Sequence, residues 1–475
     1  MTGIYFAGAF FIGGGLFFNR NRVINYLLVL AFLALQIGFT LFEYQHRNTI
    51  ELSYFNADAL GILMLITLTI ISVPAMYHSY VYLSDKNDNP RHRAFYYAAM
   101  VMLLTALSAA YLANHIAVTW IFVELTTLSA SVLIYHRRNP NSLEGTWKYI
   151  FVCAISITLV FIGILFLSFA LHQAGTDDLS FAVLIKKAPE LNLFWLRLAF
   201  IFIFTGFTAK LGLVPMYTAG IDAKDKAPSP AGALLSSVLM NVGFVGIFRF
   251  YTVMANSPLH SWANHVILIA ALLSIFVATV YMTKVKNIKR MFAYSSIEHA
   301  GIAMLGLVAG GIGYYAAVLH IILHAFVKSA FFFQMGQIYR IYKSKSIYDA
   351  GNYFKYNLTG SMVMLLGFFS ATAMPPAGLF ISELLIFRSL FEADYLAVLI
   401  VVILLLTIII WAFGKNIFKL LFSPAVGLDE TNIEKIKPVE SLSQFFLLGL
   451  AVYLGLNPPQ KLVTLIQEAI KNLPQ

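Results

Sequence analysis

Charged residues are scarce in this chain. Asp, Glu, Lys and Arg make up 11% of its 475 residues, whereas a soluble globular domain carries about 25%. Hydrophobic residues make up 60%, and the mean hydropathy is +0.78. A large water-soluble core would still need a charged surface. The shortage therefore excludes a soluble fold and indicates an integral membrane protein whose surface faces lipid.

Cysteine is almost absent, since Cys153 is the single one and lies in an apolar run. One thiol cannot form a disulfide within the chain, and an iron–sulfur cluster needs several thiolates. The sequence also lacks the glycine-rich dinucleotide motif and the G-x-x-x-x-G-K-S/T phosphate loop. We therefore expect no cofactor and no redox centre in this chain.

Acidic residues are outnumbered, which gives a net charge of +10. In a soluble protein this surplus would favour nucleic acid as a partner. In a membrane protein, Lys and Arg in cytoplasmic loops set the orientation of the helices. We therefore expect the lipid bilayer as a partner, and no nucleic acid.

Long apolar segments are what the chain does contain. A spanning helix needs about 20 apolar residues, and backbone groups in lipid must pair internally, so each segment is expected to be helical. About fourteen segments qualify by this length. They are 3–19, 23–42, 57–83, 94–113, 115–136, 147–172, 195–219, 229–252, 262–284, 296–312, 314–341, 359–390, 395–421 and 439–457. The predicted fold class is an all-α polytopic membrane protein.

The basic residues predict the orientation. Most Lys and Arg follow odd-numbered helices, for example Arg20, Lys86, Arg137, Lys284 and Lys343. Loops rich in Lys and Arg stay in the cytoplasm. With an even number of spans, both termini are predicted on the outer (periplasmic) side of the plasma or inner membrane.

Two of the predicted helices are interrupted by proline. The seventh contains "FTAKLGLVPM", in which Lys210 precedes Pro215, and the twelfth contains "AMPPAGLFISELL", in which Pro375 and Pro376 precede Glu383. Broken helices at corresponding places in two halves of a chain are typical of inverted-repeat transporters.

Two opposite charges are expected to pair inside the membrane. Glu124 lies in the middle of the fifth predicted helix and Lys210 in the middle of the seventh. An ionisable side chain at this depth is costly and is retained when it is paired, hydrated or functional. A buried lysine beside a carboxylate can gain or lose a proton when its partner moves. The alternative is a static structural ion pair.

His320, His324 and Lys328 follow each other at a spacing of four in "LHIILHAFVKSAFFF". This spacing places them on one stripe of a helix, over roughly 12 Å. Such a stripe can support a hydrogen-bonded water chain, and histidine titrates near neutral pH. Two histidines at this spacing can also bind a metal, but no carboxylate or cysteine at a useful spacing completes that site, so we expect no metal. The remaining alternative is that these are ordinary hydrogen-bonded core residues.

Two further polar residues lie within predicted helices. Glu383 follows the proline break of the twelfth helix, where it would end a proton path or cap a broken half-helix, since carboxylates are favoured at helix N-termini. Asn241 lies in the middle of the eighth helix. It cannot titrate, but it can orient water or pair across helices.

The segment "RMFAYSSIEHAG" places Glu298 and His299 near the start of the tenth predicted helix. We interpret them as a possible proton entry from the cytoplasm, with helix capping as the alternative. Arg249, near a helix end as well, is expected at the membrane interface.

Four motifs resemble one known family. "FTAKLGLVPM" followed by "DAKDKAPSPAGALLSSVLMNVG", "KNIKRMFAYSSIEHAG", "LHIILHAFVKSAFF" and "MPPAGLFISELLIF" resemble its seventh and eighth helices, its ninth-to-tenth linker, and its eleventh and twelfth helices. The family is the antiporter-like proton-translocating membrane subunits. It includes the large membrane subunits of respiratory complex I, multisubunit Na+/H+ antiporters and the membrane arms of group 4 nickel–iron hydrogenases. The resemblance covers about residues 57–422.

The resemblance implies fourteen helices with two inverted five-helix repeats, helices 4–8 and 9–13, in which helices 7 and 12 are broken. The implied organisation is 1–93 for helices 1–3, 94–253 for the first repeat, 262–422 for the second, and 423–475 for a loop, helix 14 and a tail.

The resemblance also implies roles for single residues. Glu124 matches the fifth-helix glutamate that pairs with the seventh-helix lysine, here Lys210. His320, His324 and Lys328 match the hydrated relay of the family's eleventh helix. Glu383 matches the last ionisable residue, in the twelfth helix. Asn241 is a departure, because many complex I and antiporter members carry lysine or histidine there.

"YTAGIDAKDKAPSP", "LEGTWKYIF" and "SSIEH" make the chain most similar to hydrogenase-4 and formate hydrogenlyase subunits. The implied function is proton translocation within a multisubunit, redox-driven complex. Implied partners are further antiporter-like subunits, a quinone-site-type subunit and peripheral redox subunits. The alternatives are a subunit of a redox-independent cation/proton antiporter, an energy-coupling partner of an inorganic-carbon uptake complex, and a scaffold that does not pump.

Overall fold

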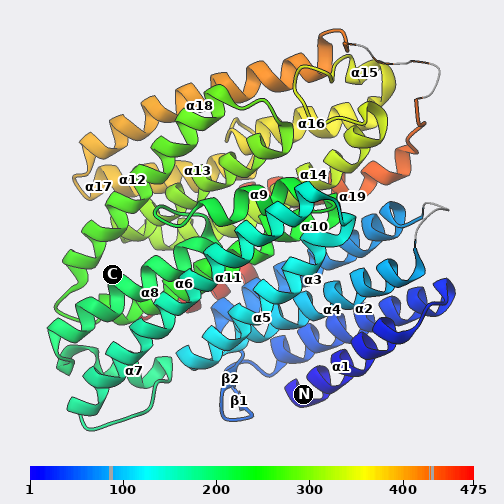
Figure 1. The fold of residues 1–475 in the computed structure, drawn as a ribbon. Coiled ribbons are helices and arrows are strands. Elements are labelled where there is room, and N and C mark those ends of the chain that lie inside the picture. Colours follow the sequence, from blue (N-terminus) through cyan, green and yellow to red (C-terminus); the bar gives the residue numbers. More distant parts are fainter. Residues whose placement is uncertain (85–88, 427, 429, 431–432, 475) are drawn as a thin grey trace.

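The computed structural model describes residues 1–84, 89–426, 428, 430 and 433–474. Lys86 and parts of the segment 423–475 therefore lie outside the described residues. Helices run roughly parallel through the molecule, with α1 at one edge and α18 at the opposite edge (Figure 1). A two-stranded antiparallel hairpin, β1 (Ile50–Glu51) and β2 (Phe55–Asn56), lies in a loop.

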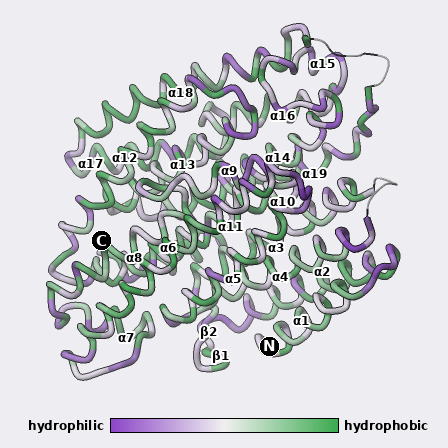
Figure 2. Tube along the Cα trace, viewed as in Figure 1, coloured by the Kyte–Doolittle hydropathy of each residue, from purple (hydrophilic) through white to green (hydrophobic). Residues whose placement is uncertain are grey.

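The helices follow the chain in this order: α1 Thr2–Phe18, α2 Arg22–Gln45, α3 Ala59–Tyr82, α4 Pro90–Leu112, α5 Ile116–Ile134, α6 Pro140–Gln173, α7 Phe181–Lys187, α8 Leu193–Leu211, α9 Thr218–Lys226, α10 Ser229–Ser236, α11 Val238–Ala255, α12 His260–Lys284, α13 Ile288–Ala309, α14 Ile312–Tyr342, α15 Tyr353–Tyr356, α16 Leu358–Ala371, α17 Gly378–Glu392, α18 Leu396–Phe422, α19 Leu442–Leu456 and α20 Gln460–Ile470. Hydrophobic residues fill the length of these helices, while hydrophilic residues gather in loops and at helix ends (Figure 2).

The prediction of an all-α polytopic membrane protein is confirmed. Among the described residues, 12 helices are long and apolar enough to cross a membrane. The first predicted span, α1, has 17 residues, and the twelfth is divided between α16 and α17. The predicted total of fourteen and the inverted repeats remain predictions.

Both predicted helix breaks are present. Helix α8 ends at Leu211 because Gly212 adopts a left-handed conformation with φ of 88°, which glycine reaches without the steric cost of a Cβ. The chain resumes as α9 at Thr218. In the same way, α16 ends at Ala371 and α17 starts at Gly378, beyond Pro375 and Pro376.

Helix α13 begins eight residues before the predicted start at 296. The side chain of Asn287 caps it by accepting from the backbone N–H of Arg290. The part that the prediction leaves out, 288–295, contains polar residues such as Lys289 and Ser295, which lower its hydropathy. They are compatible with a spanning helix because α13 packs against protein and not against lipid.

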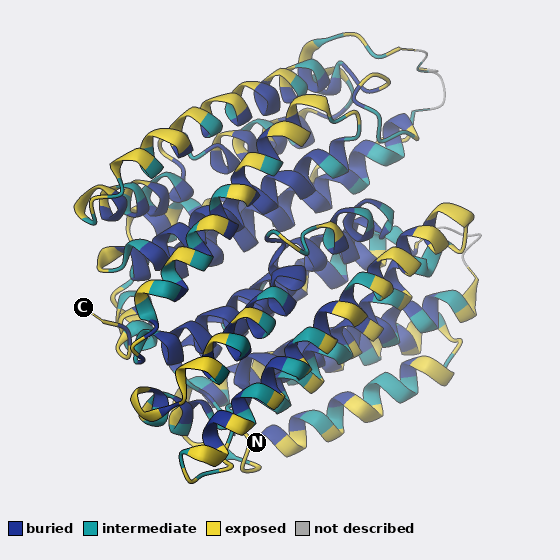
Figure 3. Ribbon diagram, turned by 60° about the vertical axis from the view of Figure 1, so that its left-hand side comes forward, coloured by how far each residue is buried: buried dark blue, intermediate teal, exposed yellow. Residues whose placement is uncertain are grey.

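Among the described residues, three candidate spans are buried over their apolar length: the unit α10–α11, α13 and α14. Helices such as α2, α6 and α18 instead expose a wide apolar face. The ribbon in Figure 3 shows this arrangement, with exposed residues on the outer helices and buried residues within. The enclosed helices carry most of the ionisable residues singled out in the sequence.

Candidate functional site

Lys210 lies at the last turn of α8, next to the break at Gly212, and is buried. Its Nζ donates to Thr127 Oγ1 at 2.7 Å, to Tyr149 OH at 3.3 Å and to Thr126 Oγ1 at 3.4 Å. The two threonines belong to α5 and the tyrosine to α6. Lys210 is thus held by neutral hydroxyl groups.

Thr127 stands between Lys210 and Glu124. Its hydroxyl donates to Glu124 Oε2 at 3.1 Å while it accepts from Lys210. The predicted direct ion pair is therefore a relayed one in this structure. Spacing along the sequence places Glu124 and Thr127 on one face of α5, but it does not show which of them Lys210 reaches. Glu124 is half-buried, so one side of it faces outward from the chain.

Lys224 in α9 is a buried lysine that the sequence analysis missed. It lines the same small cavity as Lys210 and Tyr149. Its Nζ donates to Met240 Sδ at 3.1 Å, and its charge acts on both His324 and Lys328. The sequence predicts a loop for "DAKDKAPSP", whereas α9 places this lysine between the two halves of the candidate relay.

Asn241 in α11 is fully buried, one residue after Met240. Neither its amide nitrogen nor its amide oxygen has a hydrogen-bond partner among the described residues. Buried polar atoms in native proteins pair with protein groups or with water. The family resemblance leads one to expect lysine or histidine at this position, where the chain has an amide. Lys224 contacts the adjacent residue, Met240.

Lys328, in the middle of α14, is fully buried and donates to Ser295 Oγ of α13 at 2.6 Å. The negative charge of Glu298 acts on it. Glu298 lies halfway along the 22-residue helix α13 and is 3% exposed. The expectation that Glu298 and His299 lie near a helix end is wrong, because α13 starts earlier than its hydropathy suggests. Their role as a proton entry stays a prediction.

The predicted stripe of His320, His324 and Lys328 is present on α14, and all three are buried. His299 of α13 meets this stripe. Its Nδ1 lies 3.2 Å from His320 Nε2, and its ring centroid lies 5.2 Å from that of His324. Both ring nitrogens of His324 are without a partner among the described residues.

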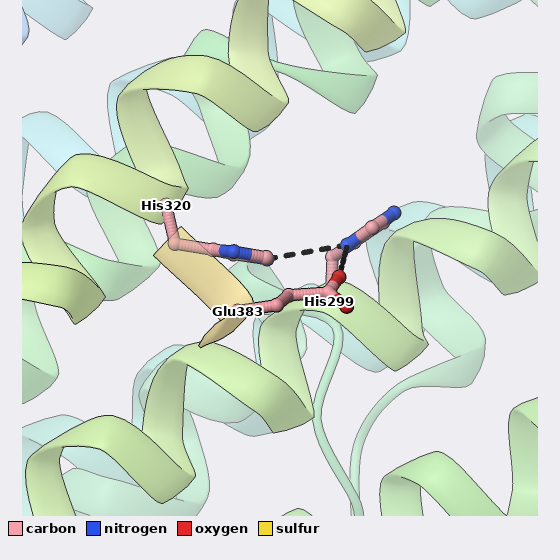
Figure 4. Close-up of side chains that lie close together, drawn as sticks. All are labelled: His299, His320 and Glu383. Carbon is pink, nitrogen blue, oxygen red and sulfur yellow. Dashed lines mark hydrogen bonds and ion pairs between the residues drawn. The ribbon is translucent and has the colours of Figure 1, made fainter. Parts of the chain in front are cut away.

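Glu383 of α17 completes this group. Its Oε1 lies 3.6 Å from His299 Nδ1, and Figure 4 shows both side chains pointing toward each other beside His320. Glu383 lies beyond the first turn of α17, so it does not cap that helix. The three side chains could hold a metal ion. The sequence predicts no metal site, because no carboxylate lies at a useful spacing from the two histidines of one helix. In the structure, the three side chains come from three different helices.

Arg249 makes structural contacts between two helix ends, and its position at the membrane interface stays a prediction. It is buried, and it donates to the backbone oxygens of Tyr111 and Ala113, both at 2.7 Å. It also pairs with Asp58 at 3.0 Å. The arginine therefore ties the C-terminal end of α4 to the N-terminal cap of α3.

Residues 113–409 match the transmembrane family of NADH:quinone oxidoreductases and Mrp antiporters. The chain belongs to this family. The match contains the residues from Glu124 to Glu383 described above. The chain is therefore a multi-pass, antiporter-like membrane subunit, and the resemblance noted in its motifs is confirmed.

The relatives include a hydrogenase-4 type protein and a subunit of an NADH-quinone oxidoreductase. The chain is 29% identical over 376 residues to a hydrogenase-4 component F homolog of Methylacidiphilum infernorum, which covers 78% of each chain. It is 25% identical to NADH-quinone oxidoreductase subunit N 1 of Aquifex aeolicus, over 93% of this chain and 92% of the relative.

A solved structure has the same fold over nearly the whole chain. The Mrp complex from Dietzia sp. DQ12-45-1b contains a chain that matches with a TM-score of 0.86, at 15% identity, over 99% of this chain and 96% of that one. At this level of identity the likeness shows the fold alone.

Proposed function

We propose that this subunit moves protons across the membrane along a line of buried ionisable side chains from Glu124 to Glu383. The observation that carries the proposal is the continuity of that line. Lys210, Lys224 and Lys328 follow one another through the protein interior, and the histidine group with Glu383 continues it. Buried charges are rare in membrane helices and mark ion paths.

The first half of the path is a switch. Lys210 reaches Glu124 through the Thr127 hydroxyl, and Glu124 has one side open to the outside of the chain. A charge or a conformational change in a neighbouring subunit acts first on Glu124. The field at Lys210 then changes, and the lysine releases its proton toward the cavity that it shares with Lys224.

The second half receives that proton. Lys224 acts electrostatically on Lys328 and His324, so the charge states of these groups depend on one another. The unpartnered amide of Asn241 and the ring nitrogens of His324 would be satisfied by water, which carries protons between them. Glu298, His299 and His320 then pass the proton to Glu383, whose side chain is 9% exposed.

The energy for this transport comes from partner subunits. We propose further antiporter-like subunits, a quinone-site-type subunit and peripheral redox subunits, because the chain has the motifs of the hydrogenase-4 branch and a relative from it. The complex would lie in the cell membrane, with both termini of this chain on the outer side.

We also propose the division into 1–93, 94–253, 262–422 and 423–475, with inverted repeats in the two central parts. It is supported by the breaks after α8 and α16, since Lys210 lies just before the first break and Glu383 lies in the second turn of α17, beyond the second break. A subunit of a redox-independent antiporter is the second candidate, favoured by the family match, because the family includes Mrp antiporters.

The test uses inverted membrane vesicles that contain the intact complex. Lys210→Ala should abolish proton uptake, measured with a fluorescent pH probe, while the complex still assembles on a native gel. Lys415→Ala, on the C-terminal part of α18, is a matched control that should pump normally. Normal pumping by Lys210→Ala would refute the relay. Proton uptake driven by a sodium gradient, without any electron donor, would favour the second candidate.

A further inference from the structure

We propose that His299, His320 and Glu383 form a binding site for a divalent transition-metal cation of the Zn2+ type, and that the bound metal blocks the proton path. The first part stands on the geometry of the three side chains. The second part rests on the function proposed above.

The separations match those of ligands around zinc. His299 Nδ1 lies 3.2 Å from His320 Nε2 and 3.6 Å from Glu383 Oε1, and the candidate ligand atoms all lie within 4.8 Å of one another. In a tetrahedral site with metal–nitrogen bonds of about 2.0–2.1 Å, neighbouring ligand atoms are about 3.3 Å apart. The Glu383 side chain is flexible, and its rotation would bring the carboxylate oxygen toward His320, from which it lies within 4.8 Å.

The hydrogen bonds around His299 fix which of its nitrogens is free. Its Nε2 lies 3.0 Å from the backbone oxygen of Ala371, which can only accept, so Nε2 carries the proton. In the neutral ring, Nδ1 then carries a lone pair and no proton. This lone pair faces His320 and Glu383.

The hydrogen bonds of His320 are compatible with two tautomers. Its Nδ1 lies 3.0 Å from Ser382 Oγ, and the same hydroxyl lies 3.0 Å from the backbone oxygen of Leu379. When Ser382 donates to Nδ1, the proton of His320 is on Nε2, which donates to His299 Nδ1 at 3.2 Å. When Ser382 donates to Leu379, Nδ1 carries the proton and Nε2 presents its lone pair beside that of His299 and the Glu383 carboxylate. A metal ion would bind to this second tautomer.

Metal-binding histidines usually donate their second ring N–H to a carbonyl or another fixed acceptor, which sets the tautomer and the ring orientation. Ala371 and Ser382 occupy these positions here. Two imidazoles and one carboxylate suit Zn2+ and similar ions, whereas Mg2+ and Ca2+ prefer oxygen ligands throughout. The same set of donors with a fourth position open is that of many zinc sites.

Access and affinity follow from the surroundings. Both histidines are essentially unexposed, while the Glu383 side chain is 9% exposed, so the ion enters past Glu383. The positive charge of Lys328 acts on His299 and opposes a second cation. Metal and proton therefore compete, and a bound metal removes the very groups through which the proposed path leaves the protein.

The decisive measurement is the zinc content of the purified complex after equilibration with Zn2+ and removal of free metal. His320→Gln and Glu383→Gln should each lose one zinc per copy of this chain relative to the wild type. His265→Gln changes an exposed histidine of α12 and is the matched control, which should keep the wild-type content. Unchanged zinc content in both cluster variants would overturn the site.

A spectroscopic measurement needs no variant. X-ray absorption at the zinc edge of the wild-type complex should show two imidazole ligands and oxygen. A spectrum with fewer than two imidazoles would contradict the assignment. As a positioning residue, Ser382 should matter through its hydrogen bond, so Ser382→Ala should weaken zinc binding about 10- to 100-fold.

The blocking role is measured separately, as reversible inhibition of proton uptake by Zn2+ that a chelator relieves. Inhibition that persists in His320→Asn vesicles with residual activity would show that zinc acts elsewhere. Zinc bound at the cluster without any inhibition would leave the site in place and contradict the proton path through these residues.

Discussion

The hydroxyl of Thr127 is the most specific link in the proposed path, and Thr127→Val removes it without changing the shape of the side chain. The hydroxyl accepts from Lys210 at 2.7 Å and donates to Glu124 at 3.1 Å. A hydrogen bond to a charged group contributes about 1.5–3 kcal/mol. Every 1.4 kcal/mol corresponds to about a factor of ten, so we expect proton uptake to fall about 10- to 100-fold.

The neighbouring residue provides the control. Thr126 also faces Lys210, but at 3.4 Å, and its hydroxyl already donates to the backbone oxygen of Val123 at 2.6 Å. Thr126→Val should therefore change proton uptake far less. Thr127→Ser keeps the hydroxyl and should restore most of the activity.

The assay is the initial rate of proton uptake in inverted vesicles, divided by the amount of assembled complex. Electron transfer by the partner subunits is measured in parallel, to separate uncoupling from failed assembly. Equal rates for Thr127→Val and the wild type, or equal losses in both valine variants, would refute the argument that this hydroxyl connects Glu124 to Lys210.

Three further predictions follow from single side chains. Lys224→Met should reduce proton uptake at least as strongly as Thr127→Val, and normal uptake would remove Lys224 from the path. Glu383→Gln should lower the number of protons moved per electron pair, and an unaltered ratio would count against its place at the end of the path. Arg249→Met leaves two buried backbone oxygens without their donor, which costs about 1–3 kcal/mol of stability. It should lower the melting temperature of the complex and leave the proton-to-electron ratio of the assembled fraction unchanged.

Much of the fold is predictable from the sequence because its signals are local. A spanning segment is recognised from its own residues, and the stripe on α14 follows from a spacing of four on one helix. The broken helices are marked by glycine and proline at the break itself. Each of these predictions depends on residues within a few turns of one another.

The rest depends on packing between helices, which spacing does not encode. His299, His320 and Glu383 come from α13, α14 and α17, so no pattern along the chain brings them together. Thr127 is one of many threonines in membrane helices, and only the position of Lys210 gives it a role. The sequence does hold one signal for Lys224, a lysine in a motif next to a predicted broken helix, a place where transporters bind ions.

Because α11, α13 and α14 are enclosed, the helices of this protein lie in two different environments. The outer helices face lipid, where an added charge costs several kcal/mol and finds no partner. The enclosed helices are surrounded by other side chains, so they can gain or exchange polar groups at a much lower cost in free energy. New chemistry can therefore arise at the centre of such a subunit, while its outer surface must stay apolar to remain in the membrane.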